Sequence, residues 1–127
     1  MRTTSDICII GGGPAGSTLA ARMAQLGHDV CLIERASFPR RHLGESLSPG
    51  VRSLLATIGA RDAVDAAGFP RVRRVMVNWD QGPRERRDPA AQGLLVDRGH
   101  FDRLLLDNAR SCGVRVLQPA TIRERQR

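Results

Sequence analysis

Three glycines near the start of the chain have the type and spacing to bind a diphosphate. Gly11, Gly13 and Gly16 form the pattern G-x-G-x-x-G. The first glycine permits a tight turn, the second lets the backbone approach a pyrophosphate, and the third allows close packing of helix on strand. An acid, Glu34, follows at about the 20-residue spacing typical of a carboxylate that binds ribose hydroxyls. Because this acid repels a 2′-phosphate, the pattern predicts FAD or NAD binding in preference to NADP.

The fingerprint requires a strand before it, a helix after it, and a second strand before the acid. Residues 6–10 carry three isoleucines and predict the first strand. A helix over 14–26 follows, with Pro14 in its first turn, where a missing N–H costs nothing. The N-terminus of this helix attracts phosphate, and residues 30–33 predict the second strand. The alternative is a glycine turn in an α/β domain that binds no nucleotide. The predicted apolar face of the helix comprises Ala15, Leu19, Ala20, Met23 and Ala24.

Beyond Glu34, apolar periodicity and turn residues predict a mixture of helices and strands. Ser48 and Pro49 are typical of a helix start, and Gly59 of its end. The predicted elements are a polar loop over 35–45, helices over 48–58, 61–67 and 100–112, strands over 72–79, 93–96 and 114–117, and an exposed loop over 80–92.

Length and composition limit the class of protein. The 127 residues, 41% of them hydrophobic, suffice for one small domain with a core. The net charge of +7 comes from arginine alone, yet the arginines are dispersed and only 3% of residues are aromatic, which argues against nucleic-acid binding. No apolar run is long enough to span a membrane. The first strand begins too early to leave room for a signal peptide, so a cytoplasmic protein is expected.

The three cysteines, Cys8, Cys31 and Cys112, lie far apart and form no C-x-x-C pair. We therefore expect core cysteines and no metal site.

Three segments of the chain resemble one enzyme family. They are GGGPAGSTLAARMA with GHDVCLIER, then FPRRHLGESLSPGV, then VDRGHFDRLLLDNARSCGVRV. Together they resemble the FAD-dependent monooxygenases that share the glutathione-reductase-like FAD domain. Within that group the chain looks most like the branch of flavin-dependent halogenases and related oxidoreductases. The resemblance implies FAD as the cofactor and an α/β fold: a Rossmann-like FAD-binding βαβ unit with a parallel sheet, incomplete, and with an inserted helical and β segment.

The resemblance also implies roles for individual residues along the bound FAD. Its pyrophosphate would lie on the glycine turn and its adenine ribose on the acid; a later segment would fold back over the cofactor, and one arginine would contact the flavin cofactor. The matching positions are Gly11, Gly13, Ala15 and Gly16, then Glu34 with Arg35 beside it, then Arg41, Gly44, Glu45 and Ser46, and finally Arg98.

Some of these positions have simpler explanations. Glu45 and Ser46 are also typical of the polar first turn of a helix. Arg98 is equally consistent with a surface charge, or with an ion pair to Asp97 or Asp102. Asp102 is more typical of a first-turn helix residue than of a catalytic acid, so no catalytic residue is assigned.

The resemblance implies a flavin-dependent oxidoreductase, above all a hydroxylase-type monooxygenase acting on a small organic substrate. Its electron donor would be NAD(P)H or a separate flavin reductase. The alternatives are a reductase of the geranylgeranyl-reductase-like type, a halogenase, or an inactive nucleotide-binding module. Tryptophan-type halogenases place a catalytic lysine shortly before a strand that ends like Asn78-Trp79. Here Arg71 stands at that position and the chain has no lysine, and a guanidinium cannot serve as an amine nucleophile.

Members of this family run to several hundred residues, with a later Gly-Asp motif and a substrate domain. Residues 1–127 are therefore expected to be the N-terminal part of an FAD domain, with the insert at about 44–92 and the substrate domain absent. On this basis the isolated chain is expected to bind FAD weakly and to turn over nothing.

Overall fold

A parallel three-stranded sheet lies at one end of the molecule. The computed structural model describes residues 3–87 and 92–124. Strand β2 (Val30–Ile33) lies between β1 (Ile7–Ile10) and β7 (Arg115–Leu117), and both pairings are parallel. The middle strand is almost fully buried, as expected where helices cover a parallel sheet. The predicted α/β fold with a parallel sheet is confirmed.

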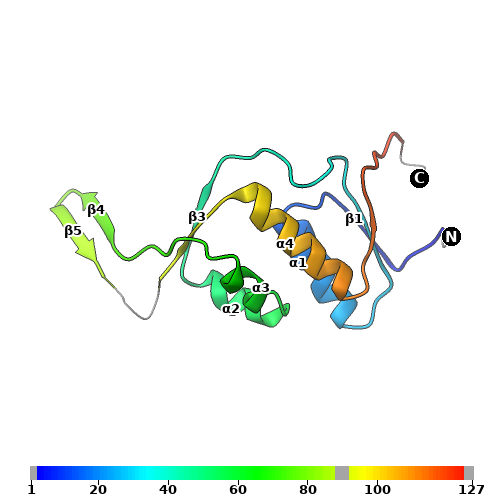
Figure 1. The fold of residues 1–127 in the computed structure, drawn as a ribbon, viewed down its shortest axis with the longest axis horizontal. Coiled ribbons are helices and arrows are strands. Elements are labelled where there is room, and N and C mark those ends of the chain that lie inside the picture. The colour runs from blue at the N-terminus through cyan, green and yellow to red at the C-terminus, as the bar shows by residue number, and fades with distance from the viewer. Residues whose placement is uncertain (1–2, 88–91, 125–127) are drawn as a thin grey trace.

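Helices α1 (Pro14–Gln25) and α4 (Arg98–Ser111) pack side by side next to the sheet (Figure 1). The buried face of α1 consists of the small residues Ser17, Ala20 and Ala21, which allow the close approach. The predicted face was partly wrong, because Ala15 and Leu19 are exposed. The apolar pattern placed the stripe slightly off the one that α4 and the sheet cover.

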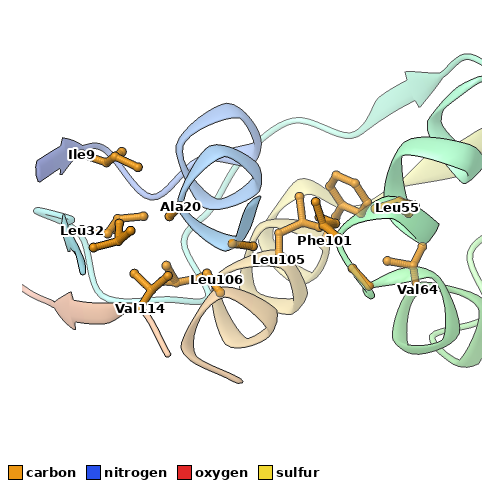
Figure 2. Packing of buried hydrophobic residues seen from close by; sticks show 14 of the residues in the cluster. Ile9, Ala20, Leu32, Leu55, Val64, Phe101, Leu105, Leu106 and Val114 are labelled. Carbon is orange, nitrogen blue, oxygen red and sulfur yellow. The ribbon is translucent and has the colours of Figure 1, made fainter. Parts of the chain in front are cut away.

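One continuous core joins the sheet to the rest of the molecule. Figure 2 shows Leu32 of β2 near Val114 and Leu106, with Phe101 farther along α4 toward Leu55 and Val64. The last two residues belong to α2 (Val51–Thr57) and α3 (Arg61–Ala66). Helix α4 is therefore the element through which the parallel sheet and helices α2 and α3 share one core.

Two short strands brace the segment between β2 and α4. Strand β3 (Glu45–Leu47) pairs antiparallel with β6 (Leu94–Val96). A Cβ on Gly93 would collide with the carbonyl of Leu47, so this approach requires glycine. The sequence predicted only a loop or a polar helix start at 45–46, and that was wrong.

The start of α2 was also predicted too early. Gly50 is the N-cap of this helix and Val51 its first residue, whereas the sequence placed the start at Ser48 and Pro49.

A β-hairpin projects from the body of the molecule (Figure 1). It joins β4 (Val75–Trp79) to β5 (Gly82–Arg86), with Trp79 opposite Gly82. The predicted exposed loop over 80–92 was therefore wrong for its first part; residues 88–91 lie outside the described residues. Pro83 suggested a loop, but proline is tolerated on an edge strand.

The cysteines differ in burial. Cys31 is buried and Cys112 is partly buried, whereas Cys8 is exposed on the edge strand β1, so the expectation of a core cysteine was wrong there. Within residues 3–87 and 92–124, no cluster of His, Cys, Asp or Glu is suited to hold a metal ion. No helix in the same ranges is long and apolar enough to cross a membrane.

Candidate cofactor site

The glycine turn between β1 and α1 leaves the helix N-terminus open. Gly11 has φ of 102°, a left-handed conformation that favours glycine. A Cβ on Gly16 would collide with the carbonyl of Gly11, so the helix meets the turn only because that position is glycine. Gly13 is the N-cap of α1 and supplies no capping side chain. The first N–H groups of the helix therefore remain available to an external acceptor.

Glu34 faces this turn from the end of β2. The N–H of Gly12 donates to Oε2 of Glu34 at 2.6 Å, and the N–H of Ala36 donates to Oε1 at 2.8 Å. Glu34 is only 2% exposed. A Cβ on Gly12 would lie 3.2 Å from the Glu34 side chain, so the middle glycine lets the acid approach. Sequence reasoning assigned roles to the other three glycines and missed this one.

The environment of Glu34 keeps its carboxylate charged. Burial raises the pKa of this carboxyl, but the N–H groups of Ala36 and Gly12 and the charges of Arg40 and Arg35 lower it, and the net pKa lies below the ordinary value. A charged carboxylate with hydrogen-bonded backbone partners is a strong acceptor. It is therefore suited to accept hydrogen bonds from ribose hydroxyls.

Arg40 is the cation that lies against the glycine turn. Its Nη1 lies 3.7 Å from Oε1 of Glu34, and its Nη2 lies 3.3 Å from Oδ2 of Asp102. The guanidinium carbon lies 4.9 Å from the ring centroid of Phe38. A Cβ built on Gly13 would have Nη2 of Arg40 as its nearest neighbour, at 3.4 Å. The Nε of Arg40 is buried and has no hydrogen-bond partner among the described residues.

The sequence predicted a role in cofactor binding for the neighbouring Arg41, and that role stays a prediction. The Arg41 side chain is exposed and lines a cavity together with Pro39, Arg40, His42 and the start of α4. Because Arg40 and Arg41 are adjacent, the sequence pattern did not show which of the two lies against the glycine turn. The preceding Phe38 was the available signal, because an aromatic residue two positions earlier can hold one guanidinium in place.

Arg98 belongs to a second ionic cluster, which connects α4 to β3. Its Nε donates to Oδ1 of Asp102 at 2.8 Å and its Nη2 to Oδ2 at 3.1 Å, while Nη1 donates to Oε2 of Glu45 at 2.7 Å. Asp102 is fully buried. The hydrogen bond to Asp102 raises the pKa of Arg98, burial lowers it, and Glu45 raises it further, for a net increase. The alternative that Arg98 pairs with Asp102 is thus correct, while its contact with flavin stays a prediction.

The two clusters form one chain of charges. Asp102 accepts from both Arg40 and Arg98, so the carboxylate that sequence reasoning treated as an ordinary helix residue joins the glycine turn to β3. Gly99 also contributes, because a Cβ there would lie 2.7 Å from the carbonyl of Arg40. The segment 39–42 can therefore lie directly on the first turn of α4.

The structure brings some of the predicted residues together and leaves others apart. Gly11, Gly13 and Gly16 surround the turn with Glu34 behind it, and Arg35 is an exposed neighbour of that acid. Ala15 is exposed on the first turn of α1. Glu45 and Ser46 belong to β3, and Gly44 directly precedes that strand. Contacts through Arg98, Asp102 and Arg40 connect this strand to the turn.

The residues at the turn fit an FAD molecule. A Cβ on Gly13 would enter open space beside Arg40, the kind of cradle that a diphosphate needs. The uncapped N-terminus of α1 and one guanidinium supply donors and positive charge for it. A charged acid beside the turn suits a ribose and disfavours a 2′-phosphate.

Comparison with known proteins agrees with this arrangement. The sequence model of a family described as FAD binding domain matches residues 4–126. The chain belongs to this FAD-binding domain family. FAD is its cofactor, as the sequence predicted, and the resemblance to the halogenase branch is confirmed.

Among its relatives is tryptophan 2-halogenase of Chondromyces crocatus, 40% identical over 122 residues that cover 91% of this chain and 23% of the relative. Another is the 1H-pyrrole-2-carbonyl-[peptidyl-carrier protein] chlorinase of Pseudomonas fluorescens, 35% identical over 92% of this chain and 31% of the relative. The chain thus spans less than a third of the length of these relatives.

Solved structures show the same fold. The myxobacterial chondrochloren halogenase CndH superposes with a TM-score of 0.79 at 40% identity, over 88% of this chain and 28% of that protein. The 2-methyl-3-hydroxypyridine-5-carboxylic acid oxygenase superposes with a TM-score of 0.73 at 26% identity, over 91% of this chain and 31% of that protein. Halogenases and an oxygenase therefore share this FAD-binding unit.

Proposed function

We propose that this chain is the FAD-holding part of a flavin-dependent monooxygenase of the hydroxylase type that acts on a small organic substrate. The observation that carries the proposal is the open glycine turn, with the charged Glu34 behind it and Arg40 beside Gly13. The open turn suits the diphosphate of one ligand, Glu34 suits its ribose, and Arg40 suits its negative charge. As in the sequence-based interpretation, residues 1–127 form the N-terminal part of the FAD domain and the insert lies at about 44–92.

Each residue at the site has a separate task. The N–H groups at the start of α1 and the guanidinium of Arg40 hold the diphosphate, while Glu34 accepts from the adenine ribose. Asp102 fixes both Arg40 and Arg98, so it positions the cations without contacting the cofactor. Bound FAD would supply the redox chemistry, including the reaction of its reduced form with O₂. The protein supplies binding, orientation and electrostatics.

Halogenation is the second candidate. The names of the relatives favour it, since several are halogenases at 32–40% identity. The residue content of this chain opposes it, because the chain has no lysine and Arg71 cannot act as an amine nucleophile. We therefore rank oxygen transfer to the substrate above halogenation.

A chimera separates the two candidates. Residues 4–126 replace the matching segment of the Chondromyces crocatus tryptophan 2-halogenase, and tryptophan turnover with chloride is followed by mass spectrometry. The expected chimera contains FAD and forms no chlorotryptophan. A control chimera carries the matching segment of the Pseudomonas fluorescens chlorinase and must chlorinate, which shows that the junction tolerates exchange. Chlorotryptophan from the first chimera at a rate within tenfold of the control would refute the ranking.

The electron donor and the compartment belong to the same proposal. The donor is NAD(P)H or a reduced flavin supplied by a separate reductase, and the location is cytoplasmic. Anaerobic mixing of the FAD-loaded enzyme with NADPH, NADH or a reductase identifies the donor by bleaching of the flavin absorbance.

A further inference from the structure

Two adjoining cavities are lined by residues that precede or belong to the β4–β5 hairpin, and residues of β3 line the first of them. Figure 1 shows where the hairpin and β3 lie. The first, of about 390 Å³, has apolar walls from Leu47, Pro49, Val72 and Val75. The second, of about 310 Å³, is walled by arginines at 73, 74 and 87. Arg73 and Arg74 line both cavities, so the two form a groove with an apolar end and a cationic end.

The cationic end has an excess of positive charge. Arg86 lines the first cavity, so four guanidiniums surround the groove. The acid Glu85 pairs with Arg74 at 3.6 Å and with Arg87 at 2.6 Å. Within the described part of the chain, Arg73 and Arg86 take part in no ion pair. The four guanidiniums outnumber Glu85, the acid that pairs with two of them, and such an excess of positive charge favours the binding of an anion.

We propose that this groove binds an organic anion with an apolar body. The body enters the first cavity, whose volume lies in the range of small-molecule sites. The anionic group, a carboxylate or a phosphate, contacts Arg73 and Arg86, which both line the first cavity beside its apolar walls. A concave apolar cavity favours a small molecule over a macromolecular polyanion.

The groove also lies next to the cofactor segment. Ser46, predicted to lie along FAD, lines the first cavity. The groove's role as the substrate site rests on the proposed function, and it then specifies the substrate as an apolar acid or phosphate ester. Binding of such an anion to the groove does not depend on FAD.

Calorimetry on the 127-residue chain without FAD tests the proposal. The probes are 1-naphthyl phosphate and 1-naphthoate, with inorganic phosphate and acetate as headgroups alone. At least one naphthyl compound is expected to bind tenfold or more tightly than its headgroup, and the tighter of the two identifies the source of the anion. Equal affinities of the naphthyl compounds and their headgroups would overturn the proposal.

Charge-matched variants locate the site. The double variant Arg73→Ala/Arg86→Ala is expected to weaken the naphthyl probe at least tenfold. The control Arg22→Ala/Arg123→Ala removes the same charge from exposed positions elsewhere and is expected to change affinity less than twofold. Far-UV circular dichroism establishes that both variants fold. Equal loss in the two variants would mean nonspecific attraction and would refute the site.

A third variant tests the apolar end. Val75→Ser is expected to weaken the naphthyl probe severalfold and to leave inorganic phosphate unchanged. Because every arm omits FAD, failure of the groove leaves the cofactor assignment standing, and failure of FAD binding leaves the groove standing.

Discussion

Replacing Glu34 with glutamine keeps the shape of the side chain and changes only what its two terminal atoms can do. In the native chain both oxygens accept backbone N–H groups, from Gly12 at 2.6 Å and from Ala36 at 2.8 Å. The amide of Gln can accept one of these and must turn its NH₂ toward the other. One N–H group then faces a donor at a site that solvent hardly reaches.

The expected loss follows from that geometry. A hydrogen bond to a charged acceptor contributes about 1.5–3 kcal/mol, so Glu34→Gln is expected to lower the free energy of unfolding at pH 7 by about that amount. The measurement is urea unfolding followed by far-UV circular dichroism. The control Glu124→Gln removes an exposed carboxylate and is expected to change the free energy by less than about 0.5 kcal/mol.

The pH dependence gives a second, independent readout. The pKa of Glu34 is lowered in the folded state, so between that pKa and the ordinary value of 4.5 the unfolded state binds more protons. The stabilisation by Glu34 is complete above pH 4.5 and is lost as the pH falls through the folded pKa. The difference between wild type and Glu34→Gln is therefore expected to shrink below pH 4.5. A difference under 0.5 kcal/mol at pH 7, or one that grows on acidification, would refute the reasoning.

Two further predictions concern α4. Asp102→Asn removes the buried charge that holds Arg98 and Arg40, and it is expected to lower the free energy of unfolding by about 1.5–3 kcal/mol. The control Asp107→Asn, at an exposed position, is expected to lower it by less than about 0.5 kcal/mol, and equal effects of the two variants in urea unfolding would contradict the ionic cluster. Leu106→Ala, at a fully buried core position, is expected to lower the free energy of unfolding by about 2–5 kcal/mol in the same assay, and a loss below 1 kcal/mol would place Leu106 outside the core.

The sequence was sufficient for the parts of the fold that depend on local pattern. The glycine turn, β1, α1 and β2 follow from one compact fingerprint, and the acid at its end faces the turn as predicted. Glycine spacing encodes this geometry directly, because Gly11 needs positive φ and Gly16 must lack a Cβ.

Features that depend on docking between distant elements escaped prediction. Strand β3 has three residues, too few for an alternating pattern, and forms only because β6 lies beside it. Asp102 is typical of a first-turn helix residue until Arg40 and Arg98 reach it from two other segments. The position of Arg40 against Phe38 and the glycine turn likewise depends on contacts made after folding, and the contact of Arg41 with FAD stays a prediction.

The claim that FAD lies across the glycine turn is tested most directly by FAD titration of the chain, followed by quenching of flavin fluorescence. Wild type is expected to show weak, saturable 1:1 binding. Gly13→Val is expected to abolish it, because the side chain would fill the open space beside Arg40. Gly50→Val, at a glycine with nothing within 4 Å of an added Cβ, is expected to bind like wild type. Unchanged affinity in Gly13→Val, or no saturable binding by the wild-type chain, would contradict the account.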